Sequence, residues 1–250
     1  MSKPNLIQVV DGIYCVMRRS YFTCSYLVET GNGLIAIDAG MKSSGSEMLS
    51  AIAELGRAVT NVKSILLTHW HNDHAAGASV LAELSGADVY YSACEADHMT
   101  RVAASTGLRG KLSAMIPENG PLVLIKGLLG NAPQQPVAAT RFVRGGQTID
   151  GFEVIDTPGH TVGHVSYFLR SKGTLFAGDA IAVVNQRLHF MARPTTEDQI
   201  AARASMISLM ELPIEAVCPG HREPLTVNVA GECDRMRGLL KAGGRWPLFG

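Results

Sequence analysis

Short apolar runs of strand length dominate the first forty residues of the chain. Four such runs are separated by turn residues, and they are Leu6–Val10, Ile13–Val16, Tyr26–Glu29 and Leu34–Asp38. The pattern predicts strands joined as an antiparallel meander, and Gly31-Asn32-Gly33 favours a tight hairpin between the last two.

Helical and strand patterns alternate in the next part of the chain. Apolar residues recur at helical spacing over residues 48–55, and Gly56 follows where a C-terminal cap belongs. A buried strand is predicted for Val62–Leu67, a second helix ending at Gly86, and another strand at Val89–Tyr91. The order helix, strand, helix, strand implies parallel strands with crossovers on one side of a sheet.

The strand pattern returns in the second half of the chain. Strands are predicted at Gly151–Asp156, Val165–Leu169, Thr174–Phe176 and Ala216–Cys218. One helix is expected after Pro194, with threonine caps, and Ile200, Ala204 and Ile207 share one of its faces. The last helix is expected at Val227–Leu240. Two packed sheets with helices outside account for this order, and residues 1–250 are predicted to form one domain.

Composition excludes several classes of protein. Apolar residues make up 46% of the 250 residues and charged residues 18%, which predicts a folded chain. Twenty-two basic residues balance twenty-two acidic ones, so nucleic acid and anionic membranes are not expected as partners. We find neither an apolar run of membrane-spanning length nor a signal peptide, and the five cysteines form no CxxC pair. We therefore expect a cytoplasmic location.

One run of six residues concentrates metal-binding side chains. The run His69-Trp70-His71-Asn72-Asp73-His74 directly follows the apolar strand Ile65-Leu66-Leu67-Thr68. In extended backbone residues 69 and 71 point the same way, while Asp73 and His74 belong to the turn and point toward a neighbouring position. Imidazole and carboxylate together suit zinc and related first-row ions. One loop could thus contribute to two metal sites.

Three further side chains complete the candidate set. Each follows a short strand and a glycine, and they are His160 in Thr157-Pro158-Gly159-His160, Asp179 in Ala177-Gly178-Asp179, and His221 in Pro219-Gly220-His221. Glycine at these places lets the backbone turn sharply and approach the cluster closely.

The order of these motifs resembles that of the metallo-β-lactamase superfamily. The motifs are HxHxDH, then TPGHTxGH, then a GD after a strand, and finally a late PGH. The resemblance runs in order from Leu34 to His221. It implies an α/β fold with a four-layer αββα sandwich and a binuclear metal site. Under the resemblance His69, His71 and His160 hold the first metal, Asp73, His74 and His221 hold the second, and Asp179 bridges them. It also implies that Asp38 and His164 support the ligands.

The resemblance implies a hydrolase that uses two zinc ions per chain, although iron or manganese also fits the donors. A hydroxide between the metals would attack an activated acyl bond of a small molecule, and Asp73 would orient the attacking water. No GxSxG elbow competes with this mechanism. Thioesters, lactones and esters all remain open as substrates.

Several alternatives within the superfamily stay open. The motif pattern is most similar to glyoxalase II-type thioesterases, whereas acyl-homoserine lactonases carry a tyrosine where this chain has Ala182. A β-lactamase with Asp at the bridging position is a further possibility. Persulfide dioxygenases share the motifs but hold a single iron, so metal analysis and oxygen consumption separate them from a hydrolase.

Substrate-binding residues are not identified by any motif. The irregular insertion at about 94–140, with a helix expected at Glu95–Ala104, is predicted to be a lid over the metals or a contact in a homodimer. Trp70 is a candidate wall of the pocket, and His189, Phe190 and Arg193 lie on a loop that could reach substrate. No role is assigned to His98.

Overall fold

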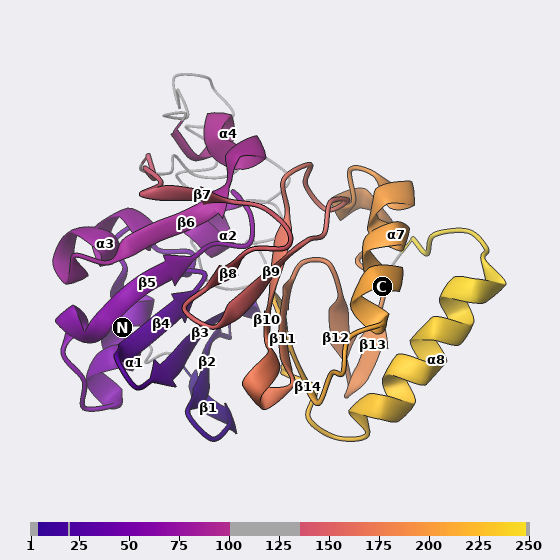
Figure 1. Ribbon diagram of the computed structural model, residues 1–250, viewed down its shortest axis with the longest axis horizontal. Helices are drawn as coiled ribbons and strands as arrows, with labels where there is room; N and C mark the ends of the chain where they lie inside the picture. The colour runs from indigo at the N-terminus through magenta and orange to yellow at the C-terminus, as the bar shows by residue number, and fades with distance from the viewer. Residues whose placement is uncertain (1–4, 20, 101–135, 249–250) are drawn as a thin grey trace.

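Two β-sheets stack face to face, with helices on their outer surfaces (Figure 1). The computed structural model describes residues 5–19, 21–100 and 136–248. The first sheet follows chain order: β1 (Asn5–Val10), β2 (Ile13–Arg18), β3 (Thr23–Thr30), β4 (Gly33–Ile37), β5 (Val62–Leu66), β6 (Asp88–Ser92) and β7 (Arg141–Val143). The second runs β14 (Ala216–Pro219), β11 (Thr174–Gly178), β10 (Val165–Leu169), β9 (Phe152–Asp156) and β8 (Thr148–Ile149).

Strand directions confirm the meander and the crossovers that the sequence predicts. Strands β1 to β4 pair antiparallel, and β4, β5, β6 and β7 pair parallel. In the second sheet β14 is parallel to β11, and the other neighbours are antiparallel. The carboxyl ends of β5, β11 and β14 carry the loops with the candidate donors, so sheet topology brings distant parts of the sequence together.

The helices form the outer layers. They are α1 (Ser46–Glu54), α2 (Asn72–Ala75), α3 (Ala78–Ser85), α4 (Ala96–Thr100), α7 (Gln199–Met210) and α8 (Val229–Ala242). Short 3₁₀ turns lie at η1 (Val59–Asn61), η2 (Ala93–Glu95), η3 (Arg170–Lys172) and η4 (Arg193–Thr195). A separate hairpin joins β12 (Ala182–Val184) and β13 (Arg187–His189). No helix within the described ranges combines the length and hydropathy needed to cross a bilayer.

Alternating side chains divide the core between the layers. In β2 and β3, Cys15 and Tyr26 belong to the apolar cluster between the sheets, whereas Val16 and Leu27 pack under α1 and α3. In β11, Phe176 faces the first sheet while Leu175 packs with α7 and α8. This two-residue period produces three apolar interfaces between four layers. The predicted αββα sandwich is therefore confirmed.

The helix predicted after Pro194 differs from expectation in its cap. Asp198 caps α7, because its Oδ1 accepts the amides of Ile200 (2.9 Å) and Ala201 (3.0 Å), and the threonines lie before it. Ile200 is 85% exposed and Ile207 46%. The face toward the sheet consists instead of Ala202, Ser205, Met206, Leu209 and Met210. The face that Ile200 and Ile207 share is therefore the one turned to solvent.

Only the two ends of the 94–140 insertion lie among the described residues. Within them the helix predicted at Glu95–Ala104 is represented by α4, which begins at Ala96. Val137 N–H donates to Met99 O (2.9 Å), and Tyr91 Oη–H donates to Val137 O (2.9 Å). Residues 101–135, where a lid or dimer contact was expected, lie outside the described residues. The sequence pattern did not predict β7 or the β12–β13 hairpin.

Candidate metal centre

The donor run 69–74 crosses from extended backbone into a helix. Residues up to His71 are extended, since His71 has φ −56° and ψ 142° and immediately precedes α2. The amide of His74 then donates to His71 O (3.0 Å) as the helical turn begins. Two imidazoles therefore project from the extended part, and Asp73 and His74 project from the turn, as the sequence predicts.

Three imidazoles converge to form the first group of donors. His69 Nε2 lies 3.0 Å from His71 Nδ1, and His160 Nε2 lies 2.9 Å from the same atom. Hydrogen bonds cannot satisfy all three nitrogens, because His71 Nδ1 carries either one proton or one lone pair and faces two other rings. A cation between them would use all three lone pairs, so this group fits a first-row metal ion.

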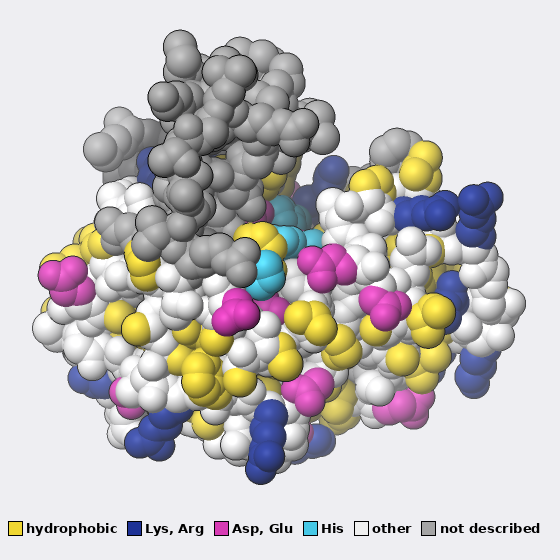
Figure 2. Space-filling view, turned by 90° about the horizontal axis from the view of Figure 1, so that it is seen from above, with side chains coloured by type: hydrophobic (Ala, Val, Ile, Leu, Met, Phe, Trp, Pro, Cys, Tyr) yellow, Lys and Arg dark blue, Asp and Glu magenta, His cyan; other side chains and the backbone are white. Residues whose placement is uncertain are grey.

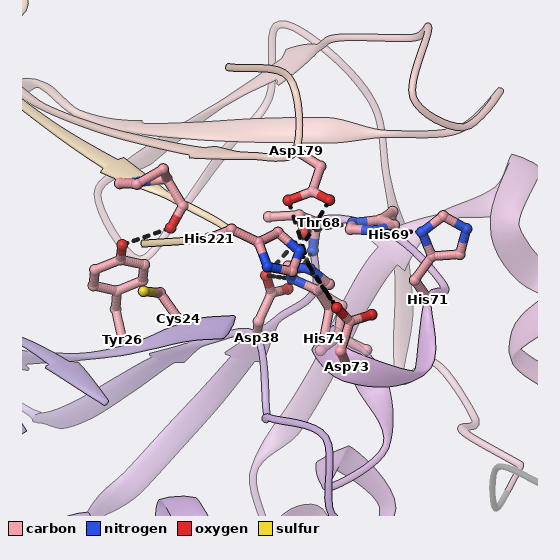
Figure 3. Close-up of polar contacts among 12 residues, drawn as sticks. Cys24, Tyr26, Asp38, Thr68, His69, His71, Asp73, His74, Asp179 and His221 are labelled. Carbon is pink, nitrogen blue, oxygen red and sulfur yellow. Dashed lines mark hydrogen bonds and ion pairs between the residues drawn. The ribbon is translucent and has the colours of Figure 1, made fainter. Parts of the chain in front are cut away.

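The second group joins the turn of the donor run to the last donor loop. His221 Nε2 lies 3.3 Å from Asp73 Oδ2, and His74 completes the group. Asp179 contacts both groups, with its carboxylate 3.3 Å from His160 Nε2, 3.4 Å from His221 Nε2 and 3.6 Å from His74 Nε2. Figure 3 shows its oxygens directed at the surrounding imidazoles. All seven predicted donors thus meet at one place, with Asp179 between the two groups.

Buried atoms without partners test whether ions fit the site. His74 Nε2 and Asp179 Oδ1 are buried and form no hydrogen bond, and they lie 3.6 Å apart. An unsatisfied nitrogen and carboxylate oxygen so close together are costly unless a cation lies between them. Imidazole and carboxylate are also the donors that zinc accepts. The residues present therefore fit divalent ions in both groups.

Asp38 and Thr68 orient two of the donor imidazoles. Asp38 accepts the amide of Thr68 (2.8 Å), its hydroxyl (2.9 Å) and, at 2.8 Å, Nδ1–H of His74. Because that hydroxyl proton is given to Asp38, Thr68 Oγ1 accepts from Nδ1–H of His69 (3.0 Å). Both rings then direct Nε2 toward the centre. Sequence reasoning identified Asp38 but missed Thr68, which it treated only as the strand end.

His164 supports Asp179 rather than a metal. The amide of Asp179 donates to His164 Nε2 (3.0 Å), so the ring proton is on Nδ1 and is donated to Thr157 Oγ1 (2.8 Å). The Thr157 hydroxyl in turn donates to Ser166 Oγ (3.0 Å), and the Ser166 hydroxyl donates to Ala177 O (3.1 Å). Burial keeps the pKa of His164 well below its usual range, which favours this neutral form. The bridging carboxylate is therefore held through its own backbone.

Glu95 joins the two donor loops and was not singled out from the sequence. Its side chain is fully buried, and its two oxygens accept the amides of Trp70 (2.9 Å) and Gly163 (2.7 Å). Trp70 lies between two donors in one loop, and Gly163 belongs to the loop that carries His160. Burial raises the pKa of Glu95, and the two amides oppose that rise. A lone Glu after a strand gave no signal in the sequence.

The pKa values of the donor histidines shift in opposite directions in the two groups. Burial, with neighbouring imidazoles, lowers the pKa of His71 to about 4 and that of His69 well below its usual range. Burial also acts to lower the pKa of His74, but Asp73, Asp179 and Asp38 together raise it to about 10. His221, His74 and His160 overcome the effect of burial on Asp179 and hold its pKa well below its usual range. A divalent ion would take the place of the proton on His74.

Aromatic side chains flank the accessible side of the centre. Figure 2 shows histidines at the surface with acidic side chains beside them, and the His221 side chain is 24% exposed. The Tyr21 ring lies 6.0 Å from the ring of His221. Trp70 lies 4.4 Å from the ring of His71 and stacks on His98 at 4.5 Å. Trp70 thus lies beside the donors and between His71 and His98, and it also packs against the apolar cluster under α1 and α3.

Comparison with known proteins agrees with this geometry. The sequence matches the metallo-beta-lactamase superfamily over residues 21–221. It is 28% identical over 236 residues to the probable metallo-hydrolase YflN of Bacillus subtilis, covering 87% of this chain and 85% of that one. It is 27% identical over 177 residues to a hydroxyacylglutathione hydrolase of Cereibacter sphaeroides, covering 70% of this chain and 52% of that one.

Solved structures show the same fold. The crystal structure of the metallo-beta-lactamase SMB-1 superposes with a TM-score of 0.64 at 24% identity, covering 89% of this chain and 82% of that one. The chain belongs to the metallo-β-lactamase superfamily. Its relatives and its donor clusters together class it as a metal-dependent hydrolase.

Proposed function

We propose that this protein is a binuclear zinc hydrolase that cleaves an activated acyl bond, such as a thioester, lactone or ester, in a small molecule. The observation that carries the proposal is the position of Asp179, whose carboxylate reaches donors of both groups. A carboxylate between two imidazole groups is suited to hold two divalent ions side by side.

The bound ions would supply an activated water near neutral pH and polarise the carbonyl of the substrate. The chain's own residues place these ions and handle protons. Asp73 is the donor carboxylate that solvent reaches, with 14% of its side chain exposed, so it is suited to orient water and accept its proton. Asp38 and His164 are buried and fix the orientation of His74 and Asp179.

An acyl substrate is favoured over other classes by two observations. The relative from Cereibacter sphaeroides is named a hydroxyacylglutathione hydrolase, although this chain spans only 52% of its length. The side of the centre reached by solvent carries the rings of Tyr21 and Trp70, which suit the apolar part of an ester or thioester. Ala182 lies on β12 and supplies no phenol at the place where lactonases use one.

A second candidate is an oxygenase with one iron. His69, His74 and Asp179 also form a group of two imidazoles and a carboxylate, the donor set of many non-haem iron enzymes. This candidate predicts one iron per chain and oxygen consumption with a persulfide.

Metal analysis together with a substrate panel tests the proposal. We expect two zinc ions per chain and turnover of at least one among a thioester, a lactone, an aryl ester and a β-lactam. H71A and D179A should each lose metal and more than about a hundredfold in kcat/KM, because ligand loss exceeds the effect of altering a supporting residue. D234A, which removes an exposed carboxylate from α8 outside both groups, is the matched control. One iron with oxygen uptake, or full activity in D179A, would overturn the proposal.

Two expectations from the sequence are part of the same proposal. The chain is expected to act in the cytoplasm, and the 94–140 insertion is expected to be either a lid over the metals or a contact in a homodimer. Cell fractionation and the mass of the purified protein in solution test them.

A further inference from the structure

A cavity of about 300 Å³ lies apart from the metal centre, between β13, α7, α8 and the segment after α8. Its lining includes His189, Phe190, Arg203, Leu239, Arg245 and Pro247. None of the cavity's lining residues belongs to the donor groups of the metal centre. The volume is at the lower end of that of small-molecule sites.

The segment after α8 forms one wall of this cavity and is held there by hydrogen bonds and ring packing. Trp246 is 5% exposed, and its Nε1–H donates to Met191 O (2.8 Å). The ring of Trp246 also packs against Phe190 at 4.7 Å, nearly edge-on. The backbone amide of Arg193 donates to Leu248 O (3.3 Å). The wall is therefore a packed part of the fold.

Arg203 is held in place by a backbone carbonyl and two aromatic rings. Its Nη2 donates to Gly244 O (3.0 Å), and its guanidinium lies 5.6 Å from the ring of Phe190 and 5.9 Å from that of Trp246. Its Nη1 is buried and has no hydrogen-bond partner among the described residues. A fixed arginine with an unused donor is suited to bind an oxyanion, because little side-chain entropy is lost on binding.

The charge around the cavity is positive. Arg203 and Arg245 line it, and no aspartate or glutamate does so among the described residues. Burial, together with the charges of Arg235 and Arg187, lowers the pKa of His189 despite the opposing charge of Glu232. His189 is therefore a neutral hydrogen-bonding group beside two permanent cations.

We propose that this cavity binds a small organic anion, a carboxylate or phosphate carried on an apolar body. The oxyanion would pair with Arg203 and Arg245, and the apolar body would lie against Phe190, Leu239 and Pro247. The site does not depend on the metal centre, so it stands whether or not the protein is an acyl hydrolase.

The tryptophans give a selective readout. The chain has two, Trp70 beside the metal centre and Trp246 beside the cavity. In zinc-loaded W70F, the fluorescence of Trp246 therefore reports this cavity and not the metal centre. The probes are cyclohexanecarboxylate and cyclohexyl phosphate, titrated at constant ionic strength, with cyclohexanol as the uncharged control.

We expect a saturable fluorescence change with at least one anion and none with cyclohexanol. Adding R203Q or R245Q should weaken binding by about tenfold or more, because each removes a charge-assisted bond. Arg245 is exposed, so R245Q also tests the site if R203Q fails to fold. R141Q removes the same charge from β7 in the other sheet and should leave affinity unchanged.

The relative affinity of the two anions identifies the preferred head group. Either order of affinity supports the site, provided that R203Q or R245Q weakens binding and R141Q does not. Equal affinity in all variants, or the absence of a saturable change with both anions, would overturn the proposal.

Discussion

The two sheets of this protein supply their metal donors in different ways. The first sheet provides four donors from a single loop of six residues directly after β5. The second sheet provides three donors from three loops, after β9, β11 and β14. Asp179 follows His160 by 19 residues, and His221 follows Asp179 by 42 residues. One set is therefore local in sequence, whereas the other exists only in the folded sheet.

The means of support differ in the same way. Side chains hold the local run, since Asp38 and Thr68 fix the imidazoles and Glu95 binds the backbone amide of Trp70. Close backbone approach permits the second set. A Cβ on Gly220 would lie 2.1 Å from Asp179 Oδ1, and one on Gly178 would lie 2.7 Å from His164 Nε2. Close backbone approach at glycines therefore distinguishes the second set, although the side chains of His164 and Glu95 also support it.

The largest effect is expected from adding a methyl group to the second set. G220A places a Cβ against the bridging carboxylate and 2.7 Å from His74 Cε1, so Asp179 must move. We expect zinc affinity to fall by about a hundredfold or more, measured by competition with a chelating dye. The matched control is G238A on the exposed face of α8, where a Cβ meets nothing within 4 Å. Unchanged zinc affinity in G220A would contradict this account of the second set.

A smaller effect is expected where a side chain links the two sets. E95A leaves the buried amides of Trp70 and Gly163 without an acceptor, and zinc affinity should fall about 10- to 100-fold. E95Q keeps one carbonyl acceptor and should recover part of that loss. The zinc-free stability of both variants is measured alongside by urea unfolding. If E95A lowers stability but leaves zinc affinity unchanged, Glu95 supports the fold and not the metal centre.

The same difference explains how much of the centre was readable from the sequence. The run from His69 to His74 was readable because four donor side chains lie within six residues, and the turn from extended backbone into a helix points them in two directions. The second set was found through glycines and strand ends, together with the resemblance to a family. Thr68 and Glu95 were missed because a hydroxyl that binds an imidazole, or a carboxylate that binds backbone amides, has no characteristic spacing in the sequence. Ile200 and Ile207 share a helix face as the spacing indicates, but that face is turned to solvent, and the sequence did not identify the face that packs on the sheet.

The last effect concerns protons on the local run, and it acts on the stability of the zinc-free protein and not on zinc affinity. In zinc-free protein the pKa of His71 is lowered to about 4, below its ordinary value of 6.5. Between pH 6.5 and 4 the unfolded chain therefore binds a proton at this residue that the folded chain does not. Stability should fall on acidification across this window, by up to about 1.4 kcal/mol per pH unit for one such group. His69 and His164, whose pKa values are also lowered, add to the slope of stability against pH.

Urea unfolding of the zinc-free protein at several pH values measures this slope. H71N, which cannot titrate at this position, should show a shallower dependence of stability on pH. An equal slope in both proteins would mean that His71 already takes up its proton in the folded state.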